Sequence, residues 1–134
     1  MRYSAAGFLL WLVPFVVSCF FIGPDGKKTI EDGLFKNIMI SIGGLTSSIL
    51  IYKCEPKTAH EGLQMAVLWL AINWGLDLCV LVPLFAAQDF DELTLATWSA
   101  AVPKWFLRIG MGYIAFVSPC VVAGACAERA AKQR

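Results

Sequence analysis

Hydrophobic residues fall into long tracts along this chain, and most charged residues are gathered between the tracts. A tract of roughly 20 mostly apolar residues is long enough for one α-helix to cross a hydrocarbon core about 30 Å thick. Four tracts have about this length, and they cover residues 5–22, 34–52, 63–86 and 105–127. The pattern therefore predicts four membrane-spanning helices in a single domain, residues 1–134.

The tracts favour helices over the strands of a membrane barrel. A barrel strand is about 10 residues of alternating character, whereas these tracts are continuously apolar. In lipid, a helix satisfies its backbone hydrogen bonds within one segment. The predicted fold class is an all-α membrane protein, a four-transmembrane-helix bundle.

Composition agrees with this prediction. Of the 134 residues, 58% are hydrophobic and only 16% are charged, and the mean hydropathy is +0.67. Soluble domains carry about 25% charged residues, so the polar coat of a soluble protein is missing. The lipid bilayer is the expected partner, and no nucleic-acid partner is expected.

The first tract also has some features of a secretory signal peptide, because Arg2 precedes an apolar run. The run is longer than the apolar region of a signal peptide, and it contains Trp11 and Pro14. No small-x-small cleavage site separates it from the turn at residues 23–26. We expect it to be the first span.

Lysine and arginine near the span ends predict the orientation. The side with both termini and the second connection holds six basic residues, and the other side holds five: Arg2, Lys53, Lys57, Arg129, Lys132 and Arg134 against Lys27, Lys28, Lys36, Lys104 and Arg108. This small excess, with the basic C-terminal tail, favours both termini in the cytoplasm, and we expect a prokaryotic cytoplasmic membrane.

The third connection, residues 87–104, mixes large apolar residues with acids and hydroxyls. One interpretation is a short interfacial helix on the outer surface, with Trp98 and Trp105 at the level of the headgroups. The other is a folded loop that caps the bundle. The sequence leaves both open.

Cysteine and histidine spacing argues against redox, haem or metal chemistry. The five cysteines contain no CxxC pair, and Cys120 and Cys126 lie on different faces of one helix. Free cysteine within an apolar span behaves as a small hydrophobic residue. His60 is the only histidine, and the chain has no HExxH motif and no glycine-rich phosphate loop. We therefore expect no catalytic, cofactor-binding or metal-binding residue, and no enzyme activity.

The third tract carries the polar residues that most need an explanation. Trp69, Asn73 and Asp77 are spaced i, i+4, i+8 and share one helix face. A carboxylate inside the bilayer must be paired, solvated or protonated. Arg108 and Lys36, near the outer ends of the fourth and second spans, have side chains long enough to reach toward it.

Two interpretations of this stripe follow. In the first, Asn73 joins helices and Asp77 is one half of a structural pair, as in a structural or accessory protein that acts through helix contacts with itself or with a larger complex. In the second, Asn73 and Asp77 line a path that binds a cation or a proton, in a small homo-oligomeric transporter or channel.

The chain also resembles a family of uncharacterised prokaryotic four-span membrane proteins of similar length. The resemblance rests on LLWLVPFVVS, LFKNIMISIGG, EGLQMAVLWLAINWGLDLCVLVP and RIGMGYIAFVSPCVVAG, one segment from each span. Its most specific part is the EGL…WLxIN…LDL pattern from Glu61 to Leu78. The resemblance implies the four-span architecture and the polar stripe, but no activity, ligand or cofactor.

Overall fold

The structure is a computed structural model that describes residues 3–23, 27–83 and 94–133. Its helices are α1 (Tyr3–Cys19), α2 (Asp32–Cys54), α3 (Ala59–Cys79), α5 (Leu95–Trp105), the π-helix η1 (Phe106–Gly110) and α6 (Gly112–Lys132). Apart from one isolated bridge between Ile22 and Lys28, no strand pairing occurs in these residues. The all-α prediction is confirmed.

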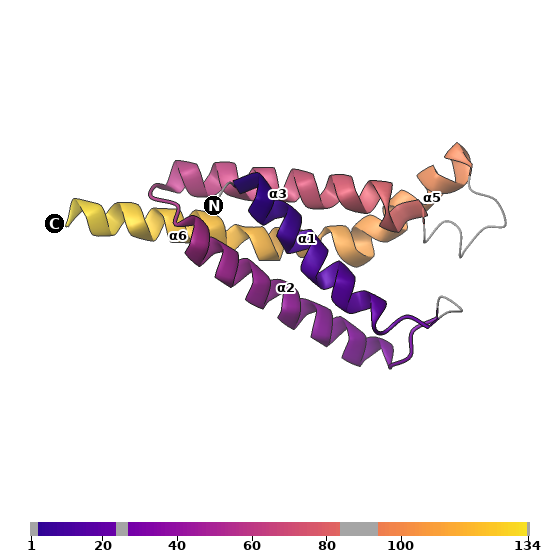
Figure 1. Ribbon diagram of the computed structural model, residues 1–134. Coiled ribbons are helices and arrows are strands. Elements are labelled where there is room, and N and C mark those ends of the chain that lie inside the picture. The colour runs from indigo at the N-terminus through magenta and orange to yellow at the C-terminus, as the bar shows by residue number, and fades with distance from the viewer. Residues whose placement is uncertain (1–2, 24–26, 84–93, 134) are drawn as a thin grey trace.

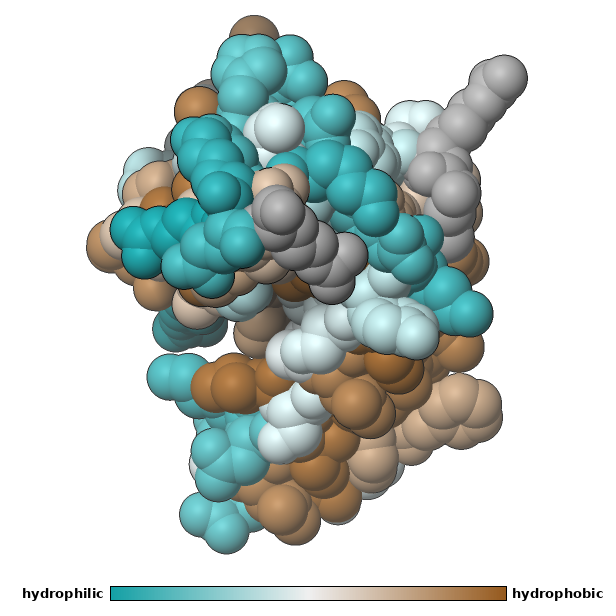
Figure 2. Space-filling view, turned by 90° about the vertical axis from the view of Figure 1, so that its left-hand side faces the viewer, coloured by the Kyte–Doolittle hydropathy of each residue, from teal (hydrophilic) through white to brown (hydrophobic). Residues whose placement is uncertain are grey.

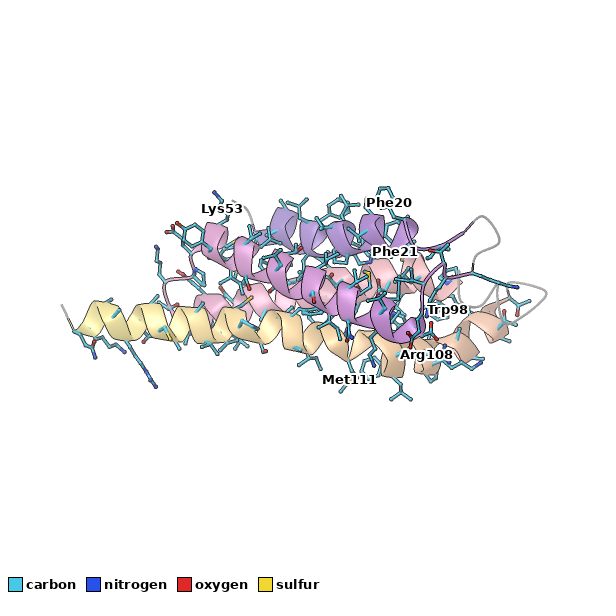
Figure 3. The ribbon with its side chains drawn as sticks, turned by 90° about the horizontal axis from the view of Figure 1, so that it is seen from below. Phe20, Phe21, Lys53, Trp98, Arg108 and Met111 are labelled. Atoms are coloured by element: carbon cyan, nitrogen blue, oxygen red, sulfur yellow. The ribbon has the colours of Figure 1, made fainter. Side chains whose placement is uncertain are left out.

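The long helices alternate in direction (Figure 1). Both termini and the α2–α3 connection lie toward one end of the molecule, and the α1–α2 connection and α5 lie toward the other. Hydrophilic residues gather over much of the end that holds the termini, above a hydrophobic region (Figure 2). Lys53 marks this end in Figure 3, whereas Phe20, Phe21, Trp98 and Arg108 mark the opposite end.

Three helical segments of the described chain are long and apolar enough to cross a membrane: Asp32–Cys54, Ala59–Pro83 and Gly112–Lys132. They cover most of the second, third and fourth predicted tracts. Tyr3–Cys19, in the first tract, is a shorter apolar helix of 17 residues. Three of the four predicted crossings are therefore supported by a helix that is long and apolar enough to span a membrane.

Two predicted boundaries need correction. The first helix ends at Cys19 instead of residue 22, because the chain already turns there. The Phe21 carbonyl accepts a hydrogen bond from the Thr29 amide on the other side of this turn. The last long helix, α6, begins at Gly112, because residues 105–110 belong to the end of α5 and to η1. Residues 84–86 of the third predicted span, and the predicted connection before residue 94, lie outside the described residues.

The N-terminus of α3 is fixed by a cap and by close packing against α6. Thr58 is the N-cap, and its hydroxyl accepts a hydrogen bond from the Glu61 amide at 3.1 Å. A Cβ at Gly62 would collide with the Cys120 carbonyl oxygen, and a Cβ at Gly124 with the Thr58 carbonyl oxygen. Glycine at both positions lets the two backbones approach closely.

The main core lies between α1, α3 and α6. Its buried side chains include Leu10 from α1, Met65 and Trp69 from α3, and Val117 and Cys120 from α6. A second cluster of buried residues, Val82, Ala101 and Trp105, joins the end of α3 to α5. Helix α5 therefore covers the end of the bundle.

Candidate functional site: a buried carboxylate between four helices

A ladder of hydrogen bonds joins the polar stripe of α3 to α1. The Trp69 indole donates to the Tyr3 carbonyl at 2.8 Å, the Asn73 amide donates to the Gly7 carbonyl at 3.1 Å, and Trp11 donates to Asp77 at 2.6 Å. The partners in all three bonds are 66 residues apart. This constant offset means that α1 and α3 run side by side in the same direction, with every fourth residue facing its counterpart.

The ladder requires a close approach at Gly7. A Cβ there would lie 2.9 Å from side-chain atoms of both Trp69 and Ile72. Glycine therefore lets the α1 backbone come near enough for its carbonyl to accept the Asn73 amide. Asn73 also donates to the Trp69 carbonyl of its own helix, at 2.7 Å.

The carboxylate of Asp77 is fully buried and accepts hydrogen bonds from three other helices. Trp11 of α1 donates to Oδ1 at 2.6 Å, Trp105 of α5 donates to Oδ2 at 2.9 Å, and the Tyr113 hydroxyl of α6 donates to Oδ1 at 3.3 Å. We call these four residues the Asp77 cluster. Indole nitrogens can only donate, so both tryptophans need an acceptor such as this carboxylate when they are buried.

The π-helix η1 brings two of these donors onto one face. Trp105 and Tyr113 are eight residues apart, a spacing that would place them about 80° apart around a regular α-helix at 3.6 residues per turn. The Met111 amide instead bonds to the Phe106 carbonyl, five residues back, at 3.0 Å. This wider turn absorbs one extra residue, so the pair is oriented as residues seven apart would be.

Aromatic and apolar side chains surround the cluster. The Trp11 ring stacks on Phe15 with centroids 4.6 Å apart, and Trp105 packs beside Phe106 and among the residues of the second core cluster. Two surface hollows in the described part of the molecule lie between α2 and α6, and none of the four cluster residues lines either of them. The Asp77 cluster is thus a closed contact between helices.

The structure does not bring the two predicted basic partners to Asp77. Arg108 and Lys36 are both exposed, and Figure 3 shows Arg108 in the same half of the molecule as Trp98. Ion pairs in the described part of the chain join Lys28 to Asp32, Lys57 to Glu55 and Lys132 to Glu128, and Asp77 takes part in none of these three. Trp105, three residues before Arg108, occupies the inward position instead.

Asn73 retains one polar atom without a partner. Its side-chain oxygen Oδ1 is buried and accepts no hydrogen bond, the one such side-chain atom among the residues that the structure describes. An unpaired buried acceptor costs about 1–3 kcal/mol. The stripe therefore holds one unused acceptor, one helical turn from Asp77.

Trp98 and Trp105 show how the third connection contacts α3. Residues 95–105 are helical, and both indoles donate toward α3: Trp98 to the Leu78 carbonyl at 3.2 Å, and Trp105 to Asp77. Trp74 of α3 completes the contact by donating to the Gly110 carbonyl at 2.9 Å. These bonds agree with the alternative in which this segment caps the bundle.

The i, i+4, i+8 spacing predicts that Trp69, Asn73 and Asp77 form one stripe, and the structure places all three on the buried face of α3. The sequence did not point to Trp11 or Tyr113 as partners of Asp77, and it left open whether the segment before the fourth span lies on the membrane surface or caps the bundle. A usable signal was present: a tryptophan inside an apolar helix needs an acceptor for its N–H, and side chains offer few acceptors there.

The described residues contain no group of three or more His, Cys, Asp or Glu side chains that could hold a metal ion. The chemistry available at the cluster is hydrogen bonding to one carboxylate. The molecule is thus an all-α protein with several membrane-length apolar helices around a buried polar contact. No family model, curated protein or solved structure matches the chain.

Proposed function

We propose that this chain is a four-span protein of a prokaryotic cytoplasmic membrane, with both termini in the cytoplasm, that acts as a structural or accessory component through helix contacts. The observation that carries the proposal is the closure of the Asp77 cluster. A transport site needs access to water and room for its cargo. Here three donors from three helices surround a fully buried carboxylate.

The four-span arrangement is supported by the ladder between α1 and α3. Helix α1 has 17 residues and is about 26 Å long at 1.5 Å per residue, close to the thickness of a hydrocarbon core. Its polar contacts face α3, so α1 belongs beside α3 at the same depth. The resemblance to the prokaryotic four-span family points to the same architecture.

In this role the Asp77 cluster fixes the register of α1, α3, α5 and α6. The Ser47 hydroxyl of α2 donates to the Phe116 carbonyl of α6, so the outer faces of α2, α3 and α6 are held in one arrangement. These faces are rich in exposed apolar residues, including Leu45 and Ile49 of α2, Val67 of α3 and Val122 of α6. Such surfaces suit contact with lipid, with further copies of the chain or with other membrane subunits.

A proton-flux assay tests the proposal. The purified protein is reconstituted into liposomes containing a pH-sensitive dye, beside Asp77→Asn and protein-free liposomes. We expect all three to leak protons at the same rate, while Asp77→Asn unfolds at lower temperature than the wild-type protein in detergent. Self-association, measured by energy transfer between labelled copies in the same liposomes, is expected for the wild-type protein.

A second candidate is the small transporter or channel, and the unused Oδ1 of Asn73 is the observation that favours it. That acceptor lies one turn from Asp77, within reach of a water or of a protonated carboxyl. Flux above the protein-free rate that Asp77→Asn abolishes would overturn the accessory proposal in favour of this one.

A further inference from the structure

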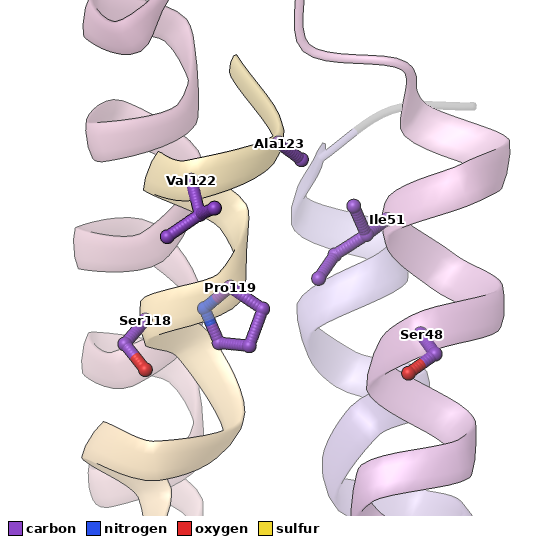
Figure 4. A pocket seen from close by; sticks show the side chains of 6 residues that line it. All are labelled: Ser48, Ile51, Ser118, Pro119, Val122 and Ala123. Carbon is purple, nitrogen blue, oxygen red and sulfur yellow. The ribbon is translucent and has the colours of Figure 1, made fainter. Parts of the chain in front are cut away.

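A surface groove runs between α2 and α6, and no residue of the Asp77 cluster lines it. One part of it, a hollow of about 520 Å³, is lined by Ser48 and Ile51 of α2 and by Ser118, Pro119, Val122 and Ala123 of α6 (Figure 4). An adjoining hollow of about 390 Å³ shares Ser48, Ile51 and Ala123 and continues to Glu55, Pro56 and Lys57. The two hollows form one groove that opens at the α2–α3 connection.

The length of this groove matches one leaflet of a bilayer. Along α6 it extends from Ser118 to Ala127, which is about 14 Å at 1.5 Å per residue. Half of a hydrocarbon core of about 30 Å is about 15 Å. If α2 and α6 cross the membrane as proposed above, the groove runs from the polar connection to the bilayer centre.

The walls of the groove suit an apolar chain. Its two serine hydroxyls already donate within their own helices, Ser48 to the Gly44 carbonyl at 2.9 Å and Ser118 to the Ala115 carbonyl at 3.3 Å. Polar contacts between helices in membranes use such hydroxyls as donors to the neighbour. The remaining wall residues offer only apolar or small surfaces to an occupant.

The mouth of the groove carries one positive and one negative side chain. Lys57 and Glu55 pair at 2.8 Å and remain more than 60% exposed. Their hydrogen bond lowers the pKa of Glu55 and raises the pKa of Lys57, so both are charged at neutral pH. A lysine has three donors and a carboxylate several acceptor positions, so each can bind a second group.

We propose that this groove binds one acyl chain of a phosphatidylethanolamine, whose phosphate contacts Lys57 and whose ammonium contacts Glu55. The acyl chain fits the apolar wall over one leaflet. The zwitterionic headgroup is complementary to the adjacent charges at the mouth. A phosphatidylglycerol could contact Lys57 but carries no ammonium for Glu55.

The test is native mass spectrometry of the full chain purified in mild detergent and supplied with phosphatidylethanolamine or phosphatidylglycerol. Wild-type protein is expected to retain one phosphatidylethanolamine per chain and at least threefold less phosphatidylglycerol. Ala123→Phe places a ring in the groove and is expected to reduce retention at least fivefold. Ala71→Phe is the matched control, because Ala71 is exposed on α3 and lines neither hollow.

The charged pair is tested separately. Lys57→Gln is expected to weaken retention of both lipids, whereas Glu55→Gln is expected to remove the preference for phosphatidylethanolamine. Equal retention by Ala123→Phe and Ala71→Phe would overturn the proposal, as would a wild-type chain dimer that Ala123→Phe dissociates, because the occupant would then be a second copy. Carbonate extraction of membranes tests the membrane placement separately. A chain that stays in the membrane pellet but retains no lipid contradicts only the groove proposal, whereas a chain released by carbonate contradicts the membrane placement.

Discussion

At the scale of single residues, Asp77 accepts hydrogen bonds from three side chains that the sequence did not identify as its partners. Two indoles and a phenol converge on its two oxygens, although none of these groups carries a positive charge. Removing any one partner leaves another buried group with fewer hydrogen bonds than it needs. The cost of a substitution should therefore depend on what the lost donor contacted.

Trp105→Phe tests this dependence. It removes the donor to Asp77 Oδ2 and keeps most of the ring's packing, so we expect a loss of about 1–3 kcal/mol in unfolding free energy. Trp98→Phe is the control, because that indole donates to a neutral carbonyl at 3.2 Å and is only partly buried. Unfolding in detergent, followed by circular dichroism, should show the smaller loss for Trp98→Phe. Equal losses would argue against a special role for the carboxylate.

Gly7→Ala tests the close approach of α1 to α3. The added Cβ would lie 2.9 Å from Trp69 and Ile72 atoms, so the helices must separate and the ladder must lengthen. We expect a loss of about 1–3 kcal/mol, the usual cost of overpacking. The matched control is Gly75→Ala, because a Cβ at Gly75 meets nothing within 4 Å. The same thermal unfolding assay compares them, and a neutral Gly7→Ala would show that the helices are not in tight contact there.

At the scale of elements, η1 determines which side chains of the last helical region face inward. It begins directly after Trp105 and ends two residues before α6 begins. Its wider turn holds one residue more than an α-helical turn, which turns Tyr113 back toward Asp77. Leu107, in the middle of this turn, is 78% exposed.

Deletion of Leu107 should therefore be tolerated. The shortened segment can form a regular α-helix in which Trp105 and Tyr113 are seven residues apart and still share a face. Deletion of Leu68, also exposed but within regular helix α3, should instead rotate the ladder residues by about 100° relative to the start of the helix and prevent folding. Yield of monodisperse protein on size-exclusion chromatography measures both. A Leu107 deletion as damaging as the Leu68 deletion would contradict this account of η1.

The sequence predicted the helices well because their main determinant is local. Tract length and continuous hydrophobicity locate α2, α3 and α6, and the i, i+4, i+8 spacing places Trp69, Asn73 and Asp77 on one face. The partners of Asp77 depend on two non-local facts, the close approach at Gly7 and the extra residue in η1. The 3.6-residue helical period predicts neither of them. Charge was the remaining guide to a partner for Asp77, and it suggested Arg108.

At the scale of the whole molecule, the proposed arrangement places both termini on the same side of the membrane. Helix α3 makes two of the helix contacts that support it: α1 lies along its polar stripe, and α6 meets its N-terminus through Gly62 and Gly124. If α1 crosses the membrane, the N-terminus lies on the same side of the membrane as the C-terminus. If it does not cross, the two termini lie on opposite sides.

Short epitope tags at the two ends test this arrangement. With four crossings and cytoplasmic termini, both tags should resist protease in spheroplasts and be digested in inverted membrane vesicles. If α1 did not cross, the two tags would be digested in opposite preparations. Digestion of both tags in spheroplasts would instead confirm four crossings with the reverse orientation.

The wide separation of the Asp77 cluster along the chain has a consequence for biogenesis. Asp77 leaves the ribosome 28 residues before Trp105 and 36 residues before Tyr113. During that interval only Trp11, already synthesised, can donate to the carboxylate from another helix. An incompletely translated chain thus has an intramembrane carboxylate that lacks two of the three donors it has in the finished protein.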